Sequence, residues 1–127
     1  MNLTTLTEGA RNLGFVLSDH GGISFDTVTI VSGSGKLKPG TVLGQITASK
    51  KFAPSAAASV TGNEGAETAK AVLAYAVDAT SADVTAVILA RLGEVKKPML
   101  VFEASVDTAP EIAAKHTQLA AAFIIAR

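Results

Sequence analysis

Apolar residues in this chain fall in short runs that are rich in β-branched side chains, and glycine, proline or short polar turns separate the runs. This pattern is typical of β-strands. The run at 71–80 and the run at 83–95 are joined by a short turn, so we expect them to form an antiparallel hairpin. The strands predicted from the pattern are residues 28–31, 41–48, 71–80, 83–95 and 98–103.

One segment has the pattern of a helix. Thr108 and Glu111 stand three residues apart, as a capping box requires, and Pro110 falls in the first turn, where its missing N–H does no harm. These signals predict a helix at 109–121, whose moderately apolar face packs on the sheet, followed by a short terminal strand in "FIIAR". The face is formed by residues at helical spacing: Ile112, Lys115, Leu119 and Phe123. The predicted fold is mainly β, with one or two short helices.

The beginning of the chain has a different pattern. Residues 1–27 mix Thr, Asn and Gly with widely spaced apolar residues, and four glycines interrupt them. We expect an arm that is extended or partly disordered in the free protein, followed by a compact β-rich domain at 28–127. An ordinary frayed terminus is the alternative, although "LGFVLS" is apolar enough to pair as a strand. Residues 49–70, rich in Ala, Ser, Thr and Gly, are predicted to form a long irregular loop.

The segment "GSGKLKPG" raises the question of a phosphate-binding loop. A Walker A loop ends in Gly-Lys-Ser/Thr and leads into a helix. Here Lys36 is followed by Leu37, Ile30 stands at the position of the first glycine, and the next element is a strand after a Pro-Gly turn. We therefore interpret the segment as a loop between strands.

Composition excludes several classes of function. The 127 residues carry 11 Lys plus Arg and 11 Asp plus Glu, so the net charge is zero and provides no electrostatic attraction to nucleic acid or anionic lipid. There is no cysteine for a disulfide or a thiolate nucleophile. No apolar stretch is long enough to cross a membrane, and the start of the chain lacks the features of a signal peptide. We expect a soluble protein made in the cytoplasm.

The residues that usually carry chemistry do not form a catalytic pattern. His20 lies in a turn and His116 on the predicted helix, where we expect it at the surface; neither has a carboxylate at a metal-ligand spacing. The carboxylates are scattered, and no Gly-x-Ser-x-Gly elbow occurs. We predict no catalytic residue, no metal site and no cofactor, and therefore a structural or binding role.

Four segments in a fixed order resemble one protein family. They are "TVTIVSGSGKLKPGTVLGQITASKKFAP", "AVLAYAVDATSADVTAVILARLGEV", "MLVFE" and the Ala-rich helix with "FIIAR". Together they resemble the head-decoration proteins of lambda-type tailed bacteriophages. The resemblance covers about residues 28–127, and the order and spacing of the segments carry it rather than any single motif.

The resemblance implies a non-enzymatic homotrimer on the outer surface of the virion. Such trimers bind the major capsid protein at local threefold positions of the expanded icosahedral capsid and stabilise it against the pressure of packaged DNA; no nucleic acid or membrane is bound. It also implies that the arm at 1–27 adds a strand to a sheet of the capsid protein, and that three arms bind multivalently. The capsid-binding residues expected on this basis are Leu3, Thr4, Leu6, Leu13, Phe15, Val16 and Leu17. We expect the subunit interface in the loop at 53–70 and part of the helix.

Two other functions remain as alternatives. "LKPGTVLGQI" is similar to a turn of biotinyl and lipoyl carrier domains, but the Met-Lys-Met or Asp-Lys-Ala that presents their target lysine is missing. A phage tail module, such as a small hydrolase of a lysis or tail apparatus, would need a clustered Ser/His/Asp set or a Glu pair, which the sequence does not single out.

Overall fold

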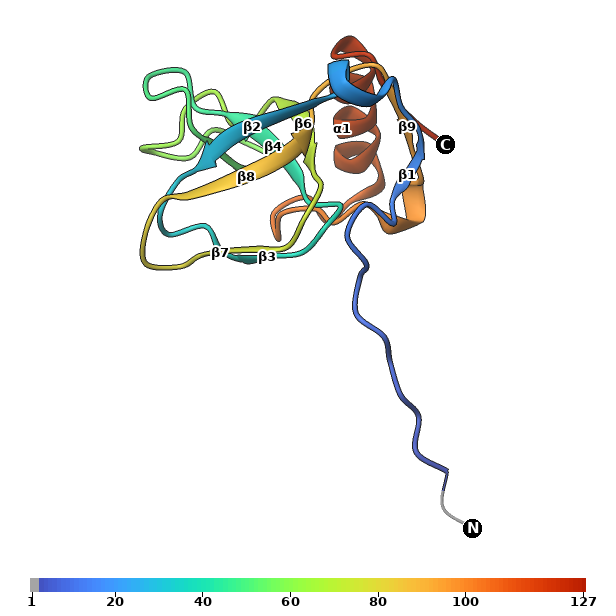
Figure 1. The fold of residues 1–127 in the computed structure, drawn as a ribbon. Helices are drawn as coiled ribbons and strands as arrows, with labels where there is room; N and C mark the ends of the chain where they lie inside the picture. The colour runs from blue at the N-terminus through green and yellow to red at the C-terminus, as the bar shows by residue number, and fades with distance from the viewer. Residues whose placement is uncertain (1–2) are drawn as a thin grey trace.

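The computed structural model describes residues 3–127 (Figure 1). These residues form ten strands, two 3-10 turns and one α-helix, which confirms the mainly β fold. The strands are β1 (Val16–Ser18), β2 (Phe25–Ile30), β3 (Gly35–Leu37), β4 (Val42–Gln45), β5 (Phe52–Pro54), β6 (Ala69–Leu73), β7 (Val77–Ala79), β8 (Val84–Leu89), β9 (Gly93–Val95) and β10 (Ile124–Ala126); the turns are η1 (Gly21–Ile23) and η2 (Lys97–Met99), and the helix is α1 (Ala109–Ala121).

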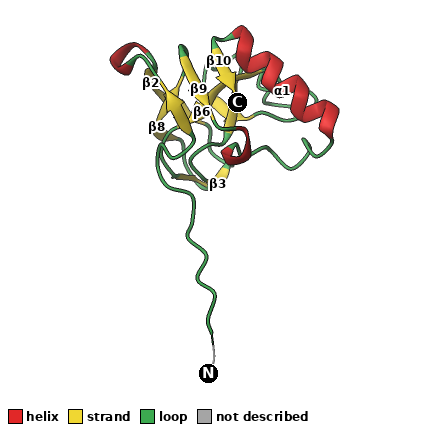
Figure 2. Cartoon of the chain, turned by 90° about the vertical axis from the view of Figure 1, so that its right-hand side faces the viewer, coloured by secondary structure: helices red, strands yellow, loops and turns green. Residues whose placement is uncertain are grey.

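The strands make three sheets. Five of them close a small barrel in the order β2-β5-β4-β6-β8, and most of its neighbouring strands are antiparallel. A second sheet has the order β1-β9-β10, and β3 pairs with β7 in a separate two-stranded ribbon. Helix α1 stands beside the barrel, with its N-terminus at the end of the domain from which the arm leaves (Figures 1 and 2).

Two clusters of buried apolar side chains hold these layers together. One fills the barrel and includes Ile30, Leu43 and Ile88. The other lies between the barrel, the helix and the β1-β9-β10 sheet, and contains Phe15 and Leu119, both at most 1% exposed. Because each cluster draws residues from segments far apart in the sequence, the barrel, the helix and the small sheet depend on one another for burial.

The helix and the last strand agree with the sequence pattern. Helix α1 spans Ala109–Ala121 and begins with the capping box of Thr108 and Glu111. The strand in "FIIAR" is β10, which pairs in parallel with β9. Strand β6 pairs with β8 in the antiparallel sense expected for the hairpin, although the connection also contains β7.

Other strand boundaries differ from the prediction. The segment 71–80 is divided between β6 and β7, and 83–95 between β8 and β9, so each contributes to two different sheets. Leu92 has a φ of 53°, which no strand residue adopts, and this breaks the second segment. Strand β2 begins at Phe25 rather than at residue 28, and β3 and β5 lie in segments predicted as loops.

The strand predicted at 98–103 is wrong. Pro98 and its neighbours form the 3-10 turn η2, and the rest of the segment makes one parallel bridge, between Val101 and Thr41. Proline cannot donate to a strand ladder and suits the first positions of a helical turn. After it, Leu100 is buried and Val101 and Phe102 are partly buried without forming a sheet. No helix within residues 3–127 has both the length and the hydropathy needed to cross a membrane.

Candidate interaction surfaces

The first described residues form an extended segment that projects from the domain (Figure 1). Residues 3–12 contain no strand or helix, and all of them are exposed; the side chains of Leu3 and Leu6 are 87% and 89% exposed. The segment has one internal ion pair, between Arg11 and Glu8 at 2.7 Å, and both side chains are about three-quarters exposed. A pair of this kind is worth little, so it does not fix the conformation of the segment. We call residues 3–12 the arm.

The chain joins the domain at Leu13. The backbone N–H of Leu13 donates to Ala74 O at 3.0 Å, and the N–H of Ala76 donates to the side-chain oxygen of Asn12 at 3.2 Å. Residues after this point belong to the folded structure: β1 pairs with β9, and β2 is part of the barrel. The apolar "LGFVLS" therefore finds its strand partner within the same chain.

The seven residues expected to bind the capsid lie in different environments. Leu3, Thr4 and Leu6 are on the exposed arm, while Leu17 is 47% exposed on β1. Leu13 and Val16 are partly buried, and Phe15 is 1% exposed in the core. Of these seven residues, Leu3, Thr4, Leu6 and Leu17 are exposed to a partner. The capsid-binding role of all seven remains a prediction.

A second irregular segment behaves differently because a buried lysine holds it. Lys115 is 2% exposed, and its ammonium group donates to Ser55 Oγ at 2.9 Å, to Ala56 O at 2.6 Å and to Glu67 O. Burial lowers the pKa of Lys115 below its usual value, and the carboxylates of Glu67 and Glu103 oppose this shift. The three hydrogen bonds fix both ends of the segment 55–67 to helix α1. We call residues 57–64, which lie between these anchor points, the clamped loop.

Sequence reasoning missed this role of Lys115, although a signal was present. Lys115 occupies a position on the apolar face of the predicted helix, where an ionisable side chain must be either solvated or fully hydrogen-bonded. Its neighbour His116 was expected at the surface, and this is wrong. The His116 ring is partly buried and lies 6.0 Å from the ring of Phe102, and its Nε2 is buried without a hydrogen-bond partner among the described residues. Burial and the nearby charge of Lys97 lower the pKa of His116.

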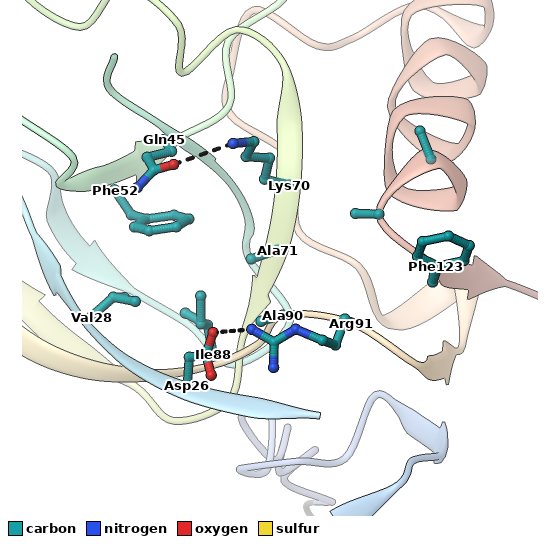
Figure 3. Close-up of a pocket in the computed structure, with 12 residues that line it drawn as sticks. Asp26, Val28, Gln45, Phe52, Lys70, Ala71, Ile88, Ala90, Arg91 and Phe123 are labelled. Carbon is teal, nitrogen blue, oxygen red and sulfur yellow. Dashed lines mark hydrogen bonds and ion pairs between the residues drawn. The ribbon is translucent and has the colours of Figure 1, made fainter. Parts of the chain in front are cut away.

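A groove of about 520 Å³ lies between the barrel and the end of helix α1 (Figure 3). Its floor is apolar and includes Val28, Phe52 and Ile88. Two polar pairs lie on its rims: Arg91 with Asp26, and Lys70 with Gln45, the latter at 3.2 Å. We call this hollow the barrel groove. Among residues 3–127, no group of three His, Asp or Glu side chains is placed to hold a metal ion.

Comparison with known proteins identifies the family. The family model described as "Bacteriophage lambda head decoration protein D" matches residues 5–124, which is nearly the whole chain. A search of curated proteins found no match. The matched range includes the barrel, strands β1 and β9, the helix and most of the arm. The chain belongs to the bacteriophage lambda head decoration protein D family.

Proposed function

We propose that this protein stabilises the phage head as a homotrimer, bound to the outer surface of the expanded capsid at local threefold positions. Family membership supports association with the capsid. In this proposal the trimer contacts the major capsid protein and reinforces the shell against the pressure of packaged DNA. The zero net charge supports a protein partner rather than nucleic acid or a membrane surface. The role is structural rather than catalytic, which sets aside the carrier and tail-module alternatives.

The observation that carries the proposal is the exposed arm. Residues 3–10 form no strand or helix and are exposed, and Leu3 and Leu6 are exposed almost completely. Such a segment can add a strand to a sheet edge, because backbone hydrogen bonds supply affinity with little demand on sequence. Ten residues reach up to about 35 Å when fully extended. Three arms on one trimer bind multivalently, so a modest affinity of each arm is amplified.

The test is binding to expanded capsids that lack their decoration protein. The full-length chain is compared with a truncated chain that begins at Asn12, which keeps Phe15 in the core and the Asn12 bond to Ala76 and removes the exposed residues before them. We expect near-stoichiometric binding of the full-length chain in multiples of three per threefold site, and loss of binding by the truncated chain. Quantification of bound protein by sedimentation with the shells measures both.

A second comparison controls for the change in length. The variant with Leu3→Ser and Leu6→Ser keeps the whole arm but removes its two apolar side chains. It is expected to bind more weakly than the full-length chain and more strongly than the truncated one. If the truncated chain bound as well as the full-length chain, the arm would not be the contact. If neither bound, the proposed function itself would be wrong.

A further inference from the structure

The barrel is incompletely closed beside the first half of β2. The register of β2 with β8 runs from Phe25 opposite Leu89 to Ile30 opposite Val84, but on its other side β2 pairs with β5 only at Ile30, opposite Phe52. Strand β5 begins at Phe52, opposite the last residue of β2. The residues before Phe52 form the connection from β4 and do not pair with β2. A stretch of β2 therefore has a neighbour on one side only.

Hydrogen bonding shows which backbone groups face the open side. The N–H of Ala90 donates to Ser24 O at 2.8 Å, so Ser24 and Ala90 form a hydrogen-bonded position of the ladder. These positions alternate along an antiparallel pair. Phe25, Thr27 and Thr29 therefore direct their N–H and C=O groups away from β8. On that side β5 pairs only with the end of β2, where the N–H of Val31 donates to Phe52 O at 3.0 Å. This open edge borders the barrel groove, which is lined by Asp26 and Val28.

A cluster of exposed apolar side chains lies beside the same groove. Phe123 is 66% exposed, Ile23 56% and Leu92 38%. They are neighbours: Arg91 donates to Ile23 O, and the N–H of Gly93 donates to Phe123 O at 3.2 Å. We call these three residues the apolar rim.

Two members of the apolar rim have an unfavourable backbone conformation. Leu92 has a φ of 53° and Phe123 a φ of 62°, in the left-handed region that bulky residues rarely occupy. Strain of this kind concentrates at binding sites. Neither side chain is fully buried within its own chain, so burial there does not offset the cost of the backbone conformation. This points to a contact outside the chain.

The clamped loop has the complementary properties. Its tip exposes Val60, which is 46% exposed, and Glu64 is exposed beside it. On the groove, the Lys70 ammonium is bound only by a neutral amide and makes no salt bridge within residues 3–127. An apolar tip with a carboxylate thus matches an apolar floor with an unpaired ammonium on its rim. Because Lys115 holds the loop, it does not have to be ordered on contact.

We propose that the barrel groove and the apolar rim are a subunit interface, and that their occupant is the clamped loop of a second copy of this chain. The inference rests on the proposed trimer and names its contact surfaces. A threefold ring needs two different surfaces on each subunit, one that inserts and one that receives. The arm leaves from the opposite end of the domain (Figures 1 and 2), so a shell that binds through the arm leaves the groove to a neighbouring subunit.

Chemical cross-linking of the full-length chain tests this assignment, because the chain has no cysteine of its own. Ser59→Cys lies on the clamped loop, and Ala121→Cys lines the groove; both positions are exposed. An equimolar mixture of the two single variants, treated with a short bis-maleimide, is expected to give a dimer that contains one chain of each kind. The double variant is expected to give covalent dimers and trimers and no larger species.

The matched control replaces Ala121→Cys with Ser81→Cys, which is equally exposed but lies in the turn between β7 and β8. We expect at least tenfold less cross-linking from the control. All reactions are run on free protein and on protein bound to shells. Cross-linking no greater than that of the control in both states would overturn the interface assignment.

A charge exchange provides an independent readout. Glu64→Lys is expected to raise the dissociation constant of the trimer about tenfold, and adding Lys70→Glu to the same chain is expected to restore it. Failure of the exchange to restore assembly would also count against the contact. Shell binding by the unmodified chain is measured in parallel. If it binds shells but the cross-linking and the charge exchange fail, the interface assignment is wrong and the proposed function stands. If it does not bind shells, the proposed function is wrong.

Discussion

The arm and the clamped loop are both irregular segments built from small and polar residues, yet the structure treats them in opposite ways. The clamped loop is held at both ends by the Lys115 ammonium, which donates to oxygens of residues 55, 56 and 67. The arm is bonded to the domain at its last residue, where the Asn12 side chain accepts from the N–H of Ala76, and Leu3 and Leu6 remain exposed. The difference shows that irregular structure and conformational freedom are separate properties, and that one buried side chain can decide between them.

The two segments should therefore lose different amounts of conformational entropy when they bind a partner. A loop that is fixed before binding loses little conformational freedom in an interface. An arm that is ordered only on a partner loses about 1–2 kcal/mol of backbone entropy for each residue that it fixes. Multivalency and new backbone hydrogen bonds must offset this loss in the arm. Changes in the loop should thus alter folding, whereas changes in the arm should alter binding alone.

The largest effect is expected where the segment that continues the clamped loop presses on the barrel. A Cβ atom at Gly44 would lie 2.0 Å from Ala66 O, and a Cβ atom at Gly9 of the arm would meet nothing within 4 Å. Gly44→Ala is expected to lower the free energy of unfolding by about 3 kcal/mol, because backbone atoms must move to admit the methyl group. Urea denaturation measures this, with Gly9→Ala as the matched control, for which we expect no change. Equal stabilities of the two variants would contradict the contact.

The next effect concerns the clamp itself. Lys115→Met preserves the length of the side chain but leaves its three oxygen acceptors without a donor. Unsatisfied buried acceptors each cost about 1–3 kcal/mol, while removal of the buried ammonium relieves its desolvation. We expect a net loss of about 2 kcal/mol in the free energy of unfolding, together with faster amide exchange in residues 55–67.

Lys36→Met is the control for the clamp, since Lys36 is exposed on β3 and does not line the barrel groove. It is expected to change the free energy of unfolding by less than about 0.5 kcal/mol. If Lys115→Met were as stable as the unmodified chain, the desolvation of the ammonium would outweigh its hydrogen bonds, and the clamp would not be what orders the loop.

Part of this fold follows from local signals in the sequence. The start of helix α1 is predictable because Thr108, Pro110 and Glu111 act within one turn. The division of the long strands cannot be predicted in this way. It depends on Leu92 adopting a positive φ, which is expected of glycine and not of leucine. Strand β3 was missed for a related reason: its Gly-Lys-Leu sequence favours a turn, and only pairing with β7 makes it a strand.

The candidate surfaces show the same limit. The exposure of Leu3 and Leu6 agrees with the sequence, in which neither residue belongs to a helical or strand-like pattern of apolar positions. The burial of Phe15 depends on contacts with residues as distant as Leu119 and Ile124, which local patterns do not reveal. The barrel groove lies between strands and a helix far apart in the chain, so no linear motif marks it. Lys115 was the one available clue, because a lysine on an apolar helix face needs buried partners.

A smaller effect is expected from the partly buried imidazole next to the clamp. The pKa of His116 is lowered in the folded state, so the unfolded chain, with a pKa near 6.5, binds a proton first as the pH falls. The free energy of unfolding should therefore decrease with acidification below about pH 6.5, until the folded state is also protonated. Urea midpoints between about pH 5 and pH 7.5 measure this, and His116→Gln should flatten the decrease relative to the unmodified chain.

His20 provides the comparison for the imidazole, because it is exposed near η1. His20→Gln should retain the full decrease, since His116 is unchanged in that variant. An identical pH profile for His116→Gln and His20→Gln would show that carboxylates elsewhere, rather than His116, produce the loss of stability in acid.

The smallest effect on folding is expected in the arm, where the comparison with the clamped loop is sharpest. Leu6→Ser should change the free energy of unfolding by less than about 0.5 kcal/mol, because the side chain is 89% exposed. Amide exchange in residues 3–12 should be unprotected, while the N–H of Thr47, bonded to Glu64 O at 2.9 Å beside the clamped loop, should be protected. If arm amides were already protected in the free protein, the arm would be ordered before it binds the shell. An effect of Leu6→Ser on shell binding could then not be explained by ordering of the arm on the shell.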